Sequence, residues 1–238
     1  MYEILAEYYD RFMADVPYDE WVKSVARILG SRKRGRDVGC GTGKFTVALK
    51  KLGYDVTGSD VSPEMLTKAA EYAKSCGENV KFLLQSAEDL KDAHPVDFVI
   101  ACCDVVNYLK NPQRFFDKAY AALAPGGVLA FDVSSEYKLT EILGNNVFTD
   151  SDDEVAYVWE NSLDARRRAV DMRLTFFIRQ QNNYYIKRTD EQTQYVRSRE
   201  EIEGMLARSG FGKIAVTGFL KSGEPTANEQ RVVFAAYK

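Results

Sequence analysis

The sequence has 238 residues, enough for one large domain or for a domain with a small insertion. Hydrophobic residues make up 45% of it, and its formal net charge of −3 gives no general attraction to nucleic acid or to anionic membranes. No apolar run approaches the roughly 18 residues of a membrane span, and the amino-terminal residues lack a signal-peptide pattern. We therefore expect a cytoplasmic monomer or weak homodimer, with neither a membrane nor nucleic acid as its partner.

The cysteines and the histidine argue against a metal site. Four cysteines occur without C-x-x-C spacing, and the chain has a single histidine. The thiols are expected to be free in a reducing compartment. His94 stands before a predicted strand, whereas open α/β sheets bind ligands beyond the opposite, carboxyl ends of their strands. It is therefore expected in a surface loop.

The first thirty residues predict two helices. Apolar and aromatic positions recur at helical spacing over residues 2–29 and are interrupted near Pro17. Two interpretations stay open. The aromatic side chains pack a helix against the sheet, or residues 1–30 form a helical lid over a ligand pocket, with Tyr9 or Tyr18 facing the ligand.

A glycine-rich stretch follows a short predicted strand at residues 35–39. Gly39, Gly41 and Gly43 alternate with small residues and precede a predicted helix over residues 43–52. Such a loop lets a ligand lie against bare main chain. A P-loop needs four residues between its glycines and then Lys-Ser/Thr, and a dinucleotide loop reads G-x-G-x-x-G. This stretch fits both spacings poorly, although a dinucleotide-binding oxidoreductase stays open as an alternative.

An acidic residue follows the loop at the end of the next predicted strand, residues 54–60. The carboxylate of Asp60 has two oxygens that can accept from the two vicinal hydroxyls of a ribose. Ser62 and Pro63 then predict the start of a helix that runs to about residue 77. The glycine loop and Asp60 together predict a site for a nucleoside-containing ligand.

The rest of the chain continues the alternation of strands and helices, with one interruption. Apolar runs and helical periodicity predict elements at residues 80–84, 96–102, 112–124, 128–133, 198–209, 213–219 and 231–237. Residues 170–179 alternate apolar and polar side chains, and further strands are predicted at 155–159 and 184–196, with a hairpin turn at Asn182-Asn183. We expect an α/β fold with a small antiparallel β insert.

Several motifs together resemble one family. They are Asp37-Val38-Gly39-Cys40-Gly41-Thr42-Gly43, Asp60-Val61-Ser62-Pro63-Glu64-Met65, Asn107-Tyr108-Leu109 and Phe131-Asp132-Val133. The chain resembles class I S-adenosylmethionine-dependent methyltransferases, in particular a group of small stand-alone bacterial enzymes. The resemblance implies a Rossmann-like, seven-stranded, mostly parallel sheet with an antiparallel last strand. It implies one domain from residues 1–152 and 198–238, and an insert at 153–197 covering the substrate pocket.

The resemblance also implies the cofactor, S-adenosylmethionine, and the residues that would bind it. Segment 85–90 matches the one that lies along the adenine edge in this family, with Ser86 in the position of the usual acid. The implied cofactor-binding residues are Asp37, Gly39, Cys40, Gly41, Asp60, Val61, Met65, Ser86, Ala87, Glu88, Cys102 and Tyr9.

The substrate side is less well defined. Asp104 and Asp132 follow or end strands on the ligand side, and we expect them to position the acceptor or act as a base, together with Tyr9 and Tyr18. Asn107 and Tyr195 are further candidates. Each acid has the alternative of a plain helix cap or turn. Relatives often carry a histidine in the third insert strand, and we align it with Thr193.

The sequence thus favours an enzyme that transfers a methyl group to nitrogen or oxygen of a small-molecule acceptor. A methyltransferase acting on RNA or protein would require a basic groove, which the net charge does not favour. A non-catalytic protein that binds S-adenosylmethionine is the third possibility.

Overall fold

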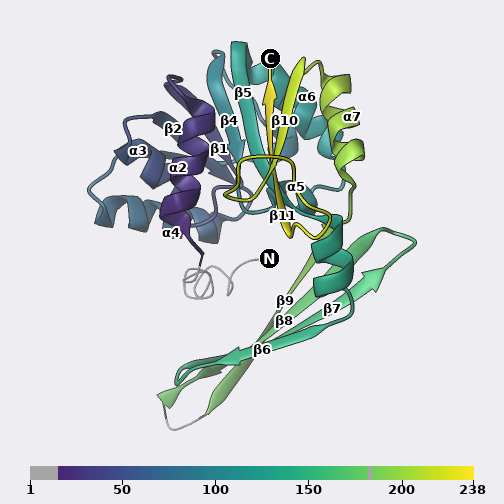
Figure 1. Cartoon of the computed structure of the whole chain (residues 1–238). Helices are drawn as coiled ribbons and strands as arrows, with labels where there is room; N and C mark the ends of the chain where they lie inside the picture. The colour runs from purple at the N-terminus through teal and green to yellow at the C-terminus, as the bar shows by residue number, and fades with distance from the viewer. Residues whose placement is uncertain (1–15, 182–183) are drawn as a thin grey trace.

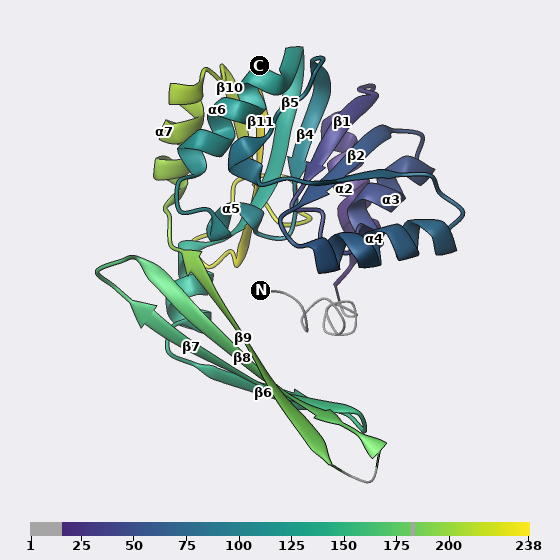
Figure 2. The same cartoon turned by 180° about the vertical axis from the view of Figure 1, so that it is seen from behind.

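The computed structural model describes residues 16–181 and 184–238. The predicted helix over residues 2–15, the position of Tyr9 and the turn at Asn182-Asn183 lie outside this range. The described chain forms a seven-stranded sheet with helices on both faces and a separate four-stranded antiparallel sheet (Figures 1 and 2).

The large sheet has the strand order β10-β11-β5-β4-β1-β2-β3. Its parallel strands are β1 (Arg34–Val38), β2 (Asp55–Asp60), β3 (Lys81–Leu84), β4 (Val96–Ala101) and β5 (Leu123–Ser134). β11 (Arg231–Tyr237) runs antiparallel to both β5 and β10 (Lys213–Gly218). This confirms the predicted Rossmann-like sheet with its antiparallel last strand.

Alternating side chains of the central strands build one core on each face of this sheet. On β4, Phe98 and Ile100 pack with α2 (Tyr18–Leu29) and α3 (Lys44–Lys51). Val99 and Ala101, on the opposite face, pack with α6 (Pro112–Ala122) and α7 (Arg199–Ser209). All four side chains are fully buried, as expected for a strand covered on both sides.

Local signals in the sequence fix the ends of several helices. Ser62 caps α4 (Pro63–Ser75) by accepting the Met65 N–H, and Pro63 stands at the first helical position. Ser198 and Glu201 form a reciprocal capping box at the start of α7. The predicted helix over residues 112–124 ends two residues earlier, because β5 already begins at Leu123.

β1 carries a buried arginine in an otherwise apolar layer. Arg36 is 4% exposed, and its guanidinium donates to Gln85 at 2.7 Å and lies 3.5 Å from Asp92. These partners come from the loops after β3 and before β4. They explain how a strand with a basic residue can occupy the centre of the sheet.

The second sheet follows β5 after a short π-helix, Lys138–Leu143. It consists of β6 (Val147–Ser151), β7 (Val155–Asp164), β8 (Ala169–Arg179) and β9 (Tyr185–Tyr195), in that order. The sequence predicted only the last three. β6 was missed because it is a short edge strand with four of its five residues exposed.

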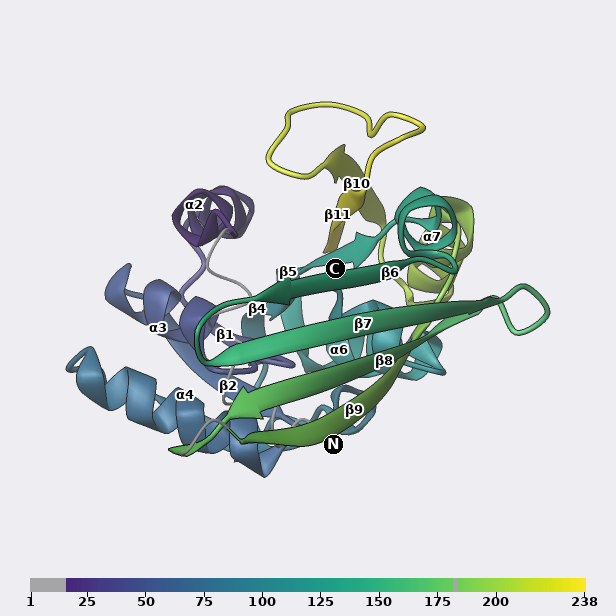
Figure 3. The ribbon, with the colours of Figure 1, turned by 90° about the horizontal axis from the view of Figure 1, so that it is seen from below.

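The insert lies across the edge of the large sheet where the parallel strands end. Figure 1 shows it below this edge, and Figure 3, viewed from below, shows β6 to β9 spread across the main domain. Ligands of open α/β sheets bind at this edge. The insert is thus placed to form the far wall of a ligand pocket.

Candidate active site

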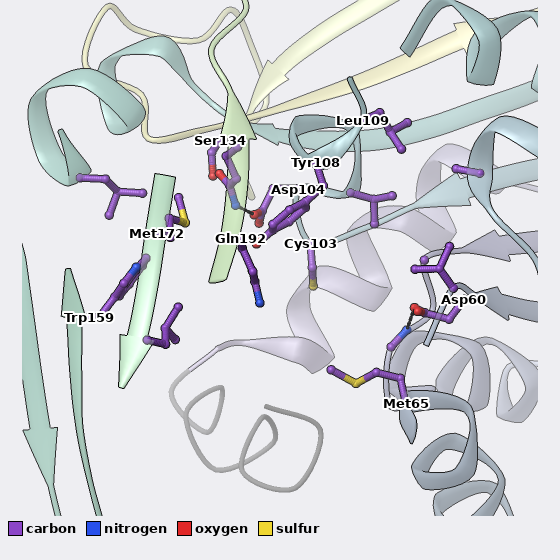
Figure 4. A pocket seen from close by; sticks show the side chains of 18 of the residues that line it. Asp60, Met65, Cys103, Asp104, Tyr108, Leu109, Ser134, Trp159, Met172 and Gln192 are labelled. Atoms are coloured by element: carbon purple, nitrogen blue, oxygen red, sulfur yellow. Dashed lines mark hydrogen bonds between the residues drawn. The ribbon is translucent and has the colours of Figure 1, made fainter. Parts of the chain in front are cut away.

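A pocket of about 370 Å³ opens between the large sheet and the insert. Figure 4 shows Asp60 and Met65 on one side of it and Trp159, Met172 and Gln192 on the other, with Asp104 and Tyr108 between them. The two sides come from segments far apart in the chain. The pocket therefore has one end at the predicted cofactor residues and the other at the inserted sheet.

The glycine loop supplies the bare backbone that the sequence predicted. Gly39 has a φ of 68° and Gly41 a φ of 52°, which favour glycine, and both line the pocket. A Cβ on Gly39 would lie 2.5 Å from Val105 Cγ2, whereas a Cβ on Gly41 would enter open space. Packing thus requires glycine at the first position, and a ligand has direct access to the main chain at the second.

Asp60 ties the end of β2 to this loop. Its Oδ2 accepts the Gly41 N–H at 2.9 Å, and its Oδ1 accepts the Ser62 N–H at 2.9 Å. Burial raises the pKa of Asp60, against the effect of these hydrogen bonds. Because each carboxylate oxygen has two acceptor sites, both can still accept from a ligand hydroxyl in the pocket.

Four other predicted residues gather at a smaller cavity of about 30 Å³ beside the loop. Asp37, Cys40, Cys102 and Tyr18 all line it. Asp37 is 1% exposed and accepts the Thr46 hydroxyl proton at 2.6 Å. Burial raises the pKa of Asp37 to about 7. Tyr18, at the start of α2, has the Lys44 ammonium 5.0 Å from its ring centroid.

The predicted adenine segment meets the main pocket only in part. Gln85 and Ala87 of this segment line it, although Gln85 was not among the predicted cofactor-binding residues; Val61 and Met65, which were, line it as well. Ser86 and Glu88 are not among the described lining residues. Ser86 precedes the short 3₁₀ helix Ala87–Asp89, and the carbonyl of Glu88 accepts a hydrogen bond from Arg114.

The turn after β4 holds two non-glycine residues in left-handed conformations. Cys103 has a φ of 65° and Asp104 a φ of 51°. Asp132 on β5 accepts the N–H of Cys103 at 2.8 Å and that of Asp104 at 3.0 Å. These bonds hold a backbone arrangement that is costly for residues with a Cβ. Such strained turns cluster at functional sites, and both residues line the pocket.

Asp132 itself does not lie where the sequence placed it. It is 1% exposed and is not among the described lining residues. Besides the two backbone N–H groups, it binds the Arg231 guanidinium. Asp132 therefore supports the Asp104 turn from beneath and does not face the substrate side.

Arg231 on β11 joins both acids and was not predicted. It lines the pocket, and its second nitrogen lies 2.9 Å from Asp104 Oδ1. Burial would raise the pKa of Asp104, but the charge of Arg231 holds it below its ordinary value. For Asp132, burial prevails over the same charge and raises the pKa. No local pattern in an otherwise apolar strand marks this arginine as functional.

The insert presents alternate residues of each strand to the pocket. These are Tyr157 and Trp159 from β7, Met172, Leu174 and Phe176 from β8, and Gln192 and Gln194 from β9. Gln194 Nε2 donates to Asp104 Oδ2 at 2.6 Å. Thr193 instead donates to Asp171 at 2.7 Å and is not a described lining residue. The pocket-facing positions of β9 are thus 192 and 194, one residue to either side of the predicted position.

Two further candidates support the walls. Asn107 is buried in α5 (Val105–Tyr108) and exchanges hydrogen bonds with the backbone of Ser134 at 3.0 and 2.9 Å. Tyr195 lies against the Arg197 guanidinium, which is 5.3 Å from its ring centroid. Neither is among the described lining residues of the main pocket. The Asn107 bonds join α5 to β5, and the Asn107 amide also donates to the Tyr195 carbonyl of the insert at 3.4 Å.

The residues present fit S-adenosylmethionine. The glycine loop leaves a cradle at Gly41 that a Cβ would enter, and Asp60 offers acceptors to a ribose. A P-loop needs a Ser or Thr hydroxyl two residues after its last glycine. Phe45 stands at that position in this chain, so the site does not fit a P-loop. The fold and this site define a Rossmann-like protein whose residues fit a nucleoside-containing cofactor.

Comparisons with known proteins identify the family. Residues 36–127 match the model of a methyltransferase domain. The chain is 33% identical to the Bacillus subtilis protein named "Putative methyltransferase YqeM" over 243 residues, which cover 100% of this chain and 97% of that protein. The chain belongs to the class I S-adenosylmethionine-dependent methyltransferases, and S-adenosylmethionine is its cofactor.

Solved structures show the same fold over nearly the whole chain. An S-adenosylmethionine-dependent methyltransferase from Clostridium acetobutylicum superposes with a TM-score of 0.88 and 28% identity, covering 99% of this chain and 98% of that one. The CcbJ methyltransferase from Streptomyces caelestis superposes with a TM-score of 0.84 over 98% and 95% of the two chains. At 18% identity, the second likeness concerns the fold alone. No helix among the described residues is long and apolar enough to cross a membrane.

Proposed function

We propose that this methyltransferase acts on a nitrogen or oxygen atom of a small-molecule acceptor. The observation that supports this most directly is that one continuous pocket runs from Asp60 to the inserted sheet. In this proposal, residues 1–152 and 198–238 bind the cofactor, and the insert at 153–197 covers the acceptor. The acceptor enters between Asp104 and the apolar side chains of β7 and β8.

The residues divide into two groups. When bound, S-adenosylmethionine supplies an electrophilic methyl group, and the C–S electron pair stays with sulfur as the new C–N or C–O bond forms. Gly41 and Asp60 hold its nucleoside, and Val61 and Met65 flank it. Trp159 and the apolar residues of β8 exclude water and orient the acceptor.

Asp104 is suited to orienting the acceptor. Arg231 and Gln194 engage its two oxygens, and its pKa is held low. A carboxylate in this state accepts a hydrogen bond from an acceptor N–H or O–H but is a weak base. An amine that is already neutral needs no stronger base, whereas a phenolic hydroxyl would lose its proton to water or to a base on the substrate side.

Methyl transfer to cell extract separates this proposal from its alternatives. The purified protein is incubated with S-adenosylmethionine carrying a labelled methyl group and with extract separated into RNA, protein and molecules below about 1 kDa. We expect label in the small-molecule fraction. Label confined to RNA or protein would contradict the proposal in favour of a macromolecular substrate. Binding without transfer to any fraction would indicate a non-catalytic binding protein.

A further inference from the structure

The charged side chains at the acceptor end of the pocket, the end beside the insert, differ in whether they have ion-pair partners. Among the described lining residues, the charged side chains are Asp60, Asp104, Lys138 and Arg231. Asp60 belongs to the cofactor end, and Asp104 pairs with Arg231 and Gln194. Lys138 has no hydrogen-bond or ion-pair partner for its ammonium among residues 16–181 and 184–238. Among the described lining residues at this end, Lys138 is therefore the one cation without a hydrogen-bonded or ion-paired carboxylate, and Asp104 is the one carboxylate.

Lys138 is held firmly in this position. It is the first residue of the π-helix, and its backbone N–H donates to Ser135 Oγ at 3.0 Å. Leu139 and Leu143 of the same helix are buried against the insert, in one cluster with Val170 and Met172. Burial lowers the pKa of Lys138, and the charge of Asp104 opposes this shift. A short π-helix is uncommon and often marks a functional site.

Strands β7 and β8 form a largely apolar wall of the same pocket. Trp159 stands opposite Leu174, and Tyr157 opposite Phe176, in the antiparallel ladder of β7 and β8. Cross-strand neighbours lie about 5 Å apart, so the pairs form a continuous surface. All four side chains line the pocket. This geometry favours a planar ring over a branched or strongly hydrated molecule.

Buried polar atoms of the lining residues lack partners. Within the described chain these are Trp159 Nε1, Gln192 Nε2, Gln194 Oε1 and Ser134 Oγ. Gln192 is 8% exposed, and Figure 4 shows its side chain reaching into the pocket. Trp159 Nε1 and Gln192 Nε2 can only donate, and the Lys138 ammonium adds a third donor group. Such buried groups are costly unless a ligand satisfies them.

We propose that the methyl acceptor is an anionic molecule with a flat ring, whose carboxylate binds Lys138. The ring lies on the apolar surface of β7 and β8, and its oxygen atoms accept from Gln192. This rests on the proposed function, because it describes the acceptor of that reaction. Within the described part of the pocket, a cationic amine would meet the like charges of Lys138 and Arg231, and the charge of Asp104 is already paired with Arg231.

Three simple probes test the charge preference. Benzoate, benzamide and benzylammonium share a ring and differ in charge. Their binding is measured by NMR titration on protein saturated with S-adenosylhomocysteine. We expect benzoate to bind at least about 10-fold more tightly than benzylammonium, as for a charge-assisted contact in a partly buried site. In the Lys138→Gln variant, the affinity for benzoate should fall about 10-fold, and the affinity for benzamide should stay within about 2-fold of the wild-type value.

Controls separate the inference from folding and from the proposed function. Lys118→Gln removes an exposed lysine of α6 and should leave benzoate binding unchanged. Unchanged affinity for S-adenosylhomocysteine shows that the Lys138 variant is folded. Equal binding of benzoate and benzylammonium, or unchanged benzoate binding in Lys138→Gln, would overturn the anionic class. If these tests succeed but no extract fraction accepts a methyl group, the proposed function fails and the anion site stands.

The labelled extract provides a second test. The small-molecule products are separated on an anion exchanger and a cation exchanger. We expect the labelled product to be retained by the anion exchanger. A labelled product retained only as a cation would overturn the anionic class while leaving small-molecule methyl transfer intact.

Discussion

The Nε2 group of Gln194 donates to Oδ2 of Asp104 at 2.6 Å, and this bond joins the insert to the turn after β4. Asp104 has a left-handed backbone, and its other oxygen binds Arg231. The acid is therefore fixed by three elements: its own turn, β9 and β11. This arrangement links the orientation of the insert to the geometry of the proposed acceptor site.

Replacing Gln194 tests this link. Gln194→Leu keeps the size of the side chain but leaves one oxygen of Asp104 without its donor. Hydrogen bonds to charged groups contribute about 1.5–3 kcal/mol, so we expect the free energy of unfolding in urea to fall by about 2 kcal/mol. Gln181→Leu, at an exposed position near the insert tip, is the matched control. Equal stability of the two variants would refute a structural role for the bond.

The buried ion pairs of Arg231 predict a larger effect. Arg231→Met leaves Asp104 and Asp132 without their countercharge, and removing one partner of a buried pair costs about 3–5 kcal/mol. We expect a loss of this size in urea unfolding. Adding Asp132→Asn should recover part of it, because one uncompensated charge is then removed. A double variant less stable than Arg231→Met would show that Asp132 is not stabilised by this arginine.

Asp37 predicts a pH dependence of stability. Its folded pKa is about 7, whereas an unfolded aspartate titrates near pH 4. Between these pH values, the folded state therefore holds a proton on Asp37 that the unfolded state releases. The stability of the folded state associated with this proton is fully present below about pH 4 and is lost as the pH rises to about 7. The stability of the wild type relative to Asp37→Asn should fall by up to about 4 kcal/mol over this range. A constant difference between pH 4 and 7 would contradict the raised pKa.

The glycine loop predicts a loss of cofactor binding on adding one methyl group. In Gly39→Ala the new Cβ would lie 2.5 Å from Val105 Cγ2 and would occupy a left-handed backbone. We expect the affinity for S-adenosylmethionine to fall at least about 10-fold, since 1.4 kcal/mol suffices for that. Gly212→Ala has open space and no positive φ, and should bind normally. Calorimetry measures both.

Much of the fold and the cofactor end could be predicted because local patterns carry them. Positive-φ glycines, the acid that ends β2 and the Ser62-Pro63 cap are local requirements. The alternation of strands and helices likewise predicts a parallel sheet. The family matches confirm the cofactor that these patterns indicate.

The acceptor end could be predicted only in part, because long-range contacts build it. Arg231 reaches Asp104 from the last strand, and Lys138 lies on a π-helix that no periodicity indicates. A one-residue difference in register turns every side chain of a strand to the other face. That is why Thr193 lies on the outer side of β9, while Gln192 and Gln194 line the pocket.

We propose that Asp60 and the glycine loop bind the cofactor at one end of this pocket. The most direct test is the calorimetric affinity for S-adenosylmethionine of the wild type, Asp60→Ala and Asp55→Ala. Asp55, at the exposed start of the same strand, is the control. Because Asp60→Ala removes hydrogen bonds to a charged carboxylate, its affinity for S-adenosylmethionine should be at least about 30-fold weaker than that of the wild type. The affinity of Asp55→Ala should be unchanged. Wild-type affinity in a folded Asp60→Ala protein would show that Asp60 does not bind the cofactor.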